Sequence, residues 1–215
     1  MCRIVLKKEV DKLEKIEIGF TQFIDFTIKQ GQAKLSHVRQ VKNQEDYHPA
    51  KDFWKAYRDG VREMHENGYS YDYLDRIAAS AHIRKKSHYV EAVKQYKKYF
   101  KNRQVEWFDP GKSFWTFGDL AVRSTPELGL IIDGKKHLVK IYLKENDDRF
   151  DRWTINSALA LMANSTRSKV DGDDVTFSVF HVKKAKRFDK QDLNEDDLII
   201  LEGEAAHFVE LWRRI

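Results

Sequence analysis

Two side chains in the second half of the chain are spaced for chemistry, the carboxylate of Glu127 and the amine of Lys140. They flank Asp133-Gly134, which lies between two apolar runs and is typical of a two-residue hairpin turn, because both turn positions favour positive φ. If Ile132 pairs with Lys135, the register sets Glu127 opposite Lys140, with their side chains roughly 5 Å apart. Such a pair can be a cross-strand ion pair on a solvated face, and a chemical role for it depends on the order of the elements around it.

Alternation of side chains assigns each residue of this hairpin to one face of a sheet. One face is apolar and comprises Leu128, Leu130, Ile132, Val139, Ile141 and Leu143. The other face is polar and comprises Glu127, Lys140, Tyr142 and Lys144. We therefore expect the candidate pair on one side of the sheet and a hydrophobic core on the other.

A second candidate is the basic segment from Arg84 to Arg103, which holds eight lysines and arginines and a single acid, Glu91. Its candidate phosphate-contacting residues are Lys85, Lys86, Lys94, Lys97, Lys98 and Lys101. On a helix the last four lie on one face and repel one another. Phosphate contacts would relieve that repulsion and release counterions, although a solvated surface explains the same pattern. The smaller basic group Lys183, Lys184, Lys186 and Arg187 either extends this surface or is a charged loop.

The elements that must position these residues are helical in the first hundred residues. Thr21 can cap a helix over 21–30 that stops at Gly31. Apolar stripes predict further helices from Pro49 to Gly68 and over 69–81, and Ser87 can cap a fourth that runs to about residue 102. The basic segment thus falls largely on the fourth helix.

The second half reads as strands with interspersed helices. We expect strands over 115–124, 128–132, 137–143 and 175–182, the last of these alternating so that His181 is a core residue. A helix over 152–164 separates the third and fourth strands. Residues 198–201 predict a short strand, and the chain closes with a helix that carries Phe208, Leu211 and Trp212.

The order helix–strand–strand–strand–helix–strand (αβββαβ), with an acid on the second strand and a lysine on the third, resembles the core of the PD-(D/E)xK, restriction-endonuclease-like superfamily. The resemblance covers about residues 87–182, and Pro126-Glu127 stands in the place of that family's Pro-Asp. The acid that the family places two residues before its lysine is missing, since Leu138 precedes Lys140 and Tyr142 precedes Lys144.

The resemblance implies a set of active-site residues. The catalytic candidates are Glu127, Lys140, Glu91 and Lys144, and Glu127 with Asp119 would hold Mg²⁺. In such enzymes the carboxylates bind the metal while the lysine orients water or stabilises the charge of the phosphorane. The sequence suits a magnesium-dependent nuclease or a degenerate, nuclease-like core that binds without cutting.

Composition narrows the other function classes. Cys2 is the only cysteine, which excludes an internal disulfide and a cysteine-based zinc site. No apolar run approaches the roughly 20 residues of a membrane span or the length of a signal peptide, so we expect no membrane and a cytoplasmic location. A net charge of +5 is mildly indicative of an anionic partner.

We therefore expect an α/β (α+β) protein with a helical region over 1–86 and a mixed-sheet domain flanked by helices over 87–215. The leading interpretation is binding or processing of DNA or RNA. The alternative is a non-catalytic protein-interaction or regulatory protein of a bacterial-type cytoplasmic system. A third interpretation is small-ligand binding by the aromatic-rich helices, through Trp54, Tyr57, Tyr69, Tyr71 and Tyr73.

Overall fold

The computed structural model describes residues 15–44, 52–143, 152–190 and 195–215, and it is a mixed α/β protein, as the sequence predicts. The helices are α1 Phe20–Thr27, α2 Gln32–Lys42, α3 Lys55–Glu66, α4 Asp72–Ser80, α5 Ile83–Phe100, α6 Arg152–Ala163 and α7 Glu195–Arg213. The strands are β1 Ile16–Gly19, β2 Val105–Phe108, β3 Ser113–Phe117, β4 Leu120–Arg123, β5 Leu128–Ile132, β6 Lys135–Tyr142, β7 Thr166–Arg167, β8 Thr176–His181 and β9 Lys186–Lys190.

The β5–β6 hairpin, which carries Lys140, lies in a five-stranded sheet of order β2-β5-β6-β8-β9. Strands β2, β5 and β6 form an antiparallel meander, α6 follows β6 in the chain, and β8 then pairs parallel to β6. The hairpin register is confirmed, because Ile132 pairs with Lys135 and Leu128 pairs with Val139. The turn residues Asp133 and Gly134 have φ values of 50° and 84°, the positive values that the two-residue turn requires.

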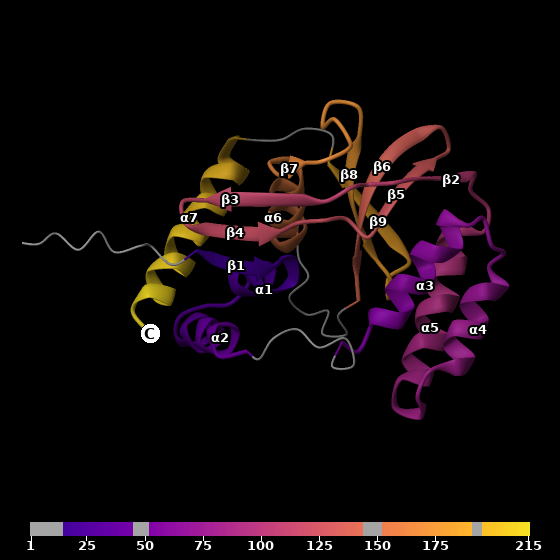
Figure 1. Ribbon diagram of the computed structural model, residues 1–215, viewed down its shortest axis with the longest axis horizontal. Helices are drawn as coiled ribbons and strands as arrows, with labels where there is room; N and C mark the ends of the chain where they lie inside the picture. Colours follow the sequence, from indigo (N-terminus) through magenta and orange to yellow (C-terminus); the bar gives the residue numbers. More distant parts are fainter. Residues whose placement is uncertain (1–14, 45–51, 144–151, 191–194) are drawn as a thin grey trace, which may run out of the picture.

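A second sheet has four strands in the order β1-β4-β3-β7. The chain passes from this sheet to the other between Arg123, the last residue of β4, and Leu128, the first residue of β5. In Figure 1 the four-stranded sheet and the bundle of α3, α4 and α5 lie on opposite sides of the β5–β6 hairpin.

The five-stranded sheet separates two hydrophobic cores. One face, with Leu130, Val139 and Phe180, packs against α3, α4 and α5. The opposite face, with Leu138 and Phe177, packs with α1, α6, α7 and the four-stranded sheet. Alternation along β6 therefore sends odd-numbered residues into the first core and even-numbered ones toward the second, which confirms the two hairpin faces.

The first core is rich in aromatic contacts that fix α5 on the sheet. The rings of Tyr96 and Phe100 stack at 4.4 Å between centroids, and Phe180 of β8 meets Phe100 at 5.1 Å in an edge-to-face arrangement. All three side chains are fully buried. Because such pairs are worth about 0.5–1.5 kcal/mol beyond their buried area, the orientation of α5 is well determined.

Several predicted elements differ from the structure. Residues 115–124 were expected as one strand of the core but lie mostly in β3 and β4 of the other sheet, so the exact αβββαβ order is interrupted by these two strands. Residues 198–201 are helical, because they continue a helix whose first turn carries Glu195, Asp196 and Asp197, acids that favour a helix N-terminus.

Helix boundaries at the N-terminal side also differ. Helix α1 begins at Phe20, with Gly19 rather than Thr21 at the N-cap. Helix α5 begins at Ile83, and His82 caps it by accepting from the backbone N–H of Arg84, so Ser87 lies inside the helix. The expected division between residues 86 and 87 falls within α5, and each core combines residues from both sides of it.

Candidate functional site

The predicted pair of Glu127 and Lys140 is formed in the structure. Lys140 Nζ lies 2.8 Å from Glu127 Oε1, and the two side chains are only 12% and 19% exposed. The other carboxylate oxygen, Oε2, accepts a hydrogen bond of 2.8 Å from the backbone N–H of Ile141. Glu127 therefore uses both oxygens within the protein, and one of them takes an N–H of β6 beyond the end of its pairing with β5.

Lys140 is held by several protein groups besides Glu127. Its ammonium donates to the carbonyl of Thr125 at 2.8 Å and lies 4.8 Å from the centre of the Phe20 ring. A cation over an aromatic face is stabilised by the quadrupole of the ring. The lysine thus joins three segments, namely β6, the crossing between the two sheets, and α1.

The structure adds Asp25 of α1 to this neighbourhood, a residue that the sequence analysis missed. A cavity of about 30 Å³ lies beside Lys140 and is lined by Thr21 and Asp25 from α1 and by Tyr142 from β6. That volume accommodates about two water molecules. Asp25 follows Thr21 by one helical turn, but no local signal connects this helix to a strand more than a hundred residues later in the sequence.

Glu91, the third candidate, does not lie beside this pair. It lies on α5, which packs against the face of the sheet that carries Val139 and Ile141. Lys140, between them in sequence, points to the opposite face. The Glu91 side chain is 55% exposed and accepts a hydrogen bond from Gln95. The structure therefore does not bring Glu91 to Lys140 as an accessory acid.

Asp119 is also remote from Glu127. It lies in the turn before β4, where it forms an ion pair with Arg213 of α7. Glu127 follows the other end of β4, and a four-residue strand spans about 13 Å. The two predicted magnesium ligands therefore do not share a site, and within the described ranges no group of three or more His, Cys, Asp or Glu side chains is arranged to hold a metal. Lys144 lies outside the described residues.

The predicted phosphate-contacting lysines divide into two groups. Lys85 and Lys97 are engaged with the protein, because Lys85 donates to the carbonyl of Asp52 beside the Phe53 ring and Lys97 forms an ion pair with Asp75. The remaining four are exposed, namely Lys86, Lys94, Lys98 and Lys101. Lys94 is 73% exposed and lies 3.7 Å from Glu91.

Two further basic groups flank the exposed lysines of α5. At the end of the helix, Arg103 pairs with Asp133 of the β5–β6 turn at 3.2 Å, and the next residues of that turn include the exposed Lys135 and Lys136. Near the middle of α5, the exposed Lys183 lines the same cavity as Glu91. We call the surface formed by the exposed lysines of α5 and these two flanks the α5 basic surface.

A polar network crosses strands β6, β8 and β9. The Ser178 hydroxyl donates to Asp189 at 2.7 Å, and His137 Nδ1 lies 3.0 Å from the same hydroxyl oxygen. Since the one hydroxyl proton goes to Asp189, Nδ1 of His137 carries a proton and donates to Ser178. Burial, together with the nearby Arg187, lowers the pKa of His137 to about 4. The histidine therefore does not activate the serine, and both are buried.

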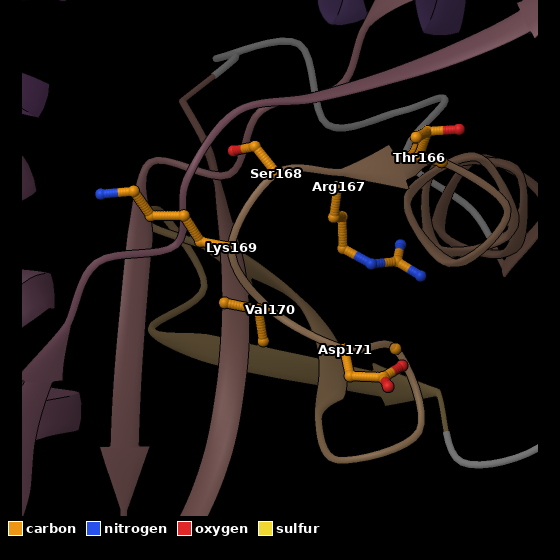
Figure 2. A pocket seen from close by; sticks show the side chains of 8 residues that line it. Thr166, Arg167, Ser168, Lys169, Val170 and Asp171 are labelled. Atoms are coloured by element: carbon orange, nitrogen blue, oxygen red, sulfur yellow. The ribbon is translucent and has the colours of Figure 1, made fainter.

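Another cavity, of about 430 Å³, is formed by the single segment 165–172 (Figure 2). Several of its polar groups already have partners within the protein. Arg167 donates to the carbonyls of Met162 and Ala163 at the end of α6, and Lys169 pairs with Asp109 at 2.5 Å. The Ser168 hydroxyl accepts from the backbone N–H of Lys112. The segment is therefore a cap on α6 rather than a ligand site.

The protein therefore has a mixed α/β fold, an ion pair between Glu127 and Lys140 at the β5–β6 hairpin, and the α5 basic surface. Comparison with protein-family models and with curated proteins finds no match. Across the described ranges, no helix combines the length and apolar character needed to cross a bilayer.

Proposed function

We propose that the protein binds nucleic acid through the α5 basic surface. The observation that carries the proposal is the exposed row of Lys94, Lys98 and Lys101 on one helix face, flanked at both ends by exposed lysines from other elements. Like charges at these spacings repel one another and destabilise the helix in the free protein. Phosphates would remove that penalty and release condensed counterions.

The dimensions of the surface suit a phosphate backbone. Lys183 follows the end of β8, which is parallel to β6, whereas Lys135 begins β6, so the two flanks are separated by the length of β6. Eight residues of strand span about 26 Å. A duplex presents one phosphate per strand every 3.4 Å along its axis, so about eight phosphates of one strand fit along the surface.

The proposal gives the Glu127–Lys140 pair a structural role and not a chemical one. Because Glu127 has both oxygens engaged and Lys140 is enclosed, we assign this pair to holding the crossing between the sheets. Phosphate contact is assigned to α5 instead.

The proposal is tested by fluorescence anisotropy with labelled DNA and RNA over a series of salt concentrations. We expect Lys94→Gln/Lys98→Gln/Lys101→Gln to weaken binding to every sequence. On duplex DNA, the slope of log K against log[salt] should fall by about 3, at about 0.9 per lost phosphate contact.

The matched control is Lys15→Gln/Arg39→Gln/Arg214→Gln, which removes the same charge from exposed positions outside α5. It should leave the salt slope unchanged. Equal losses in the two triple variants would mean that net charge alone attracts the ligand. Absence of binding at low salt would refute the proposal.

A further inference from the structure

A cavity of about 270 Å³ opens beside α5 at one end of the five-stranded sheet. Its apolar wall is formed by Ala92 of α5, by Leu143 and Val182, and by Trp54 before α3. Leu143 follows β6 and Val182 follows β8, and these two strands are parallel neighbours. The cavity therefore lies at the carboxyl ends of parallel strands, where ligands commonly bind in open α/β sheets.

Trp54 provides a rigid aromatic wall. Its ring stacks on Tyr89 with 5.4 Å between centroids and 9° between planes, and the Tyr89 hydroxyl donates to the carbonyl of Phe53 at 2.6 Å. The indole is thus held in position before any ligand arrives. The cavity volume is just below the range of roughly 300–1,000 Å³ that holds whole drug-sized ligands, so it suits one planar ring system.

The rim of the cavity is polar and carries both charges. Glu91 and Gln95 face it from successive turns of α5 and are joined by a hydrogen bond of 2.6 Å, and Lys183 faces it from the end of β8. Glu91 is the only acid between Arg84 and Arg103. A carboxylate repels phosphate but accepts a hydrogen bond from an amino group, so its place within a basic surface fits the edge of a base rather than the backbone.

We propose that this cavity receives one unpaired nucleobase of a single-stranded nucleic acid, with an amino-bearing base such as adenine or cytosine preferred at Glu91. The strand's phosphates would lie on Lys94 and Lys183, so the proposal rests on the proposed function and deepens it. A base inside a duplex is paired and stacked and cannot enter such a cavity unless it is extruded. The site therefore selects single strands over duplexes of the same length.

The test compares labelled single strands of equal length made of dA, dC, dT or abasic sugar-phosphate units. The abasic strand keeps every phosphate and lacks every base. The wild-type protein should bind the dA and dC strands about tenfold more tightly than the abasic strand, as expected for a base stacked on an aromatic side chain. The affinity for the dT strand should lie between that for the abasic strand and that for the dA and dC strands.

Three variants separate the base contact from the phosphate contact. Trp54→Ala should bring the ratio between base-containing and abasic strands close to one. Glu91→Gln, at an exposed position where folding is not at stake, should reduce the preference for dA and dC over dT. Lys98→Ala is the matched control, because it should weaken binding to all strands equally and leave both ratios unchanged.

The outcomes distinguish this inference from the function on which it rests. Equal binding of abasic and base-containing strands, or a duplex bound as tightly as the single strands, would overturn the base cavity and leave the phosphate surface standing. No binding of any strand at low salt would overturn both. Displacement of the strand by adenosine monophosphate at equal concentration would show that a free nucleotide is the ligand, which also overturns the single-strand assignment.

Discussion

The ion pair of Glu127 and Lys140 predicts a strong thermodynamic coupling between the two side chains. Glu127→Ala removes the acceptor of the Ile141 N–H, in a residue only 7% exposed, and leaves the Lys140 ammonium without its carboxylate. A buried N–H without an acceptor destabilises the folded protein by about 1–3 kcal/mol. Removal of one partner of a buried ion pair lowers the free energy of unfolding by about 3–5 kcal/mol. Since both side chains keep some exposure, we expect a total loss of about 3 kcal/mol.

The double-mutant cycle isolates the pair from the backbone contact. Lys140→Met keeps the Glu127–Ile141 hydrogen bond and should lower the free energy of unfolding by about 2 kcal/mol, since it leaves one partly buried charge unpaired. The double variant should lose about 1–2 kcal/mol less unfolding free energy than the two single variants lose together, which is within the range for residues in direct contact. Urea unfolding followed by tryptophan fluorescence measures all four species.

An exposed ion pair serves as the control. Lys15 and Glu17 lie 3.1 Å apart with side chains 71% and 60% exposed, and removal of such a pair changes stability by less than about 1 kcal/mol. If Glu127→Ala is no more destabilising than Glu17→Ala, or if the cycle shows no coupling, then the pair does not hold the crossing between the sheets. In that case the assignment of Glu127 to a structural role is refuted.

Two further predictions concern stability. Burial lowers the pKa values of His137 and His65 to about 4 in the folded protein, so the unfolded chain, with a value of 6.5, binds protons that the folded one does not. The stabilisation is complete above pH 6.5 and is lost as the pH falls toward 4, about 3 kcal/mol per histidine; His137→Gln should remove about half of this dependence, and an unchanged profile of unfolding free energy against pH would contradict it. A Cβ on Gly129 would lie 2.3 Å from the Phe108 carbonyl oxygen, whereas one on Gly203 of α7 meets nothing within 4 Å. Gly129→Ala should therefore destabilise by about 2 kcal/mol or more, and Gly203→Ala should stabilise by up to about 1 kcal/mol; thermal unfolding compares the two, and equal shifts would disprove the steric argument.

The sequence specified the hairpin well because its information is local. The Asp133-Gly134 turn needs positive φ, and side-chain alternation then fixes which residues share a face. Lys140 therefore meets Glu127, as expected. His181 alternates with apolar neighbours and is fully buried, also as expected.

The parts of the site that the sequence analysis placed wrongly depend on packing between distant elements. Glu91 lies on a helix of the correct type, but which face of the sheet that helix covers is decided by the aromatic contacts of Tyr96 and Phe100 with Phe180. Asp119 was assigned to the strand that leads to Glu127, yet the turn before β4 sends it toward α7. Asp25 lines the same cavity as Lys140 because α1 packs on the same face of the sheet.

The parallel pairing of β1 with β4 has a consequence for how the chain folds. It joins Ile16 to Leu120 and closes a loop that contains α1 to α5, β2 and β3. The length-dependent part of the entropy of closing such a loop is about 4 kcal/mol, whereas the β5–β6 hairpin closes through Asp133-Gly134 alone. Pairings that are local in sequence form in microseconds, and distant ones form far more slowly. The N-terminal strand, although synthesised early, is therefore among the last elements to find its place.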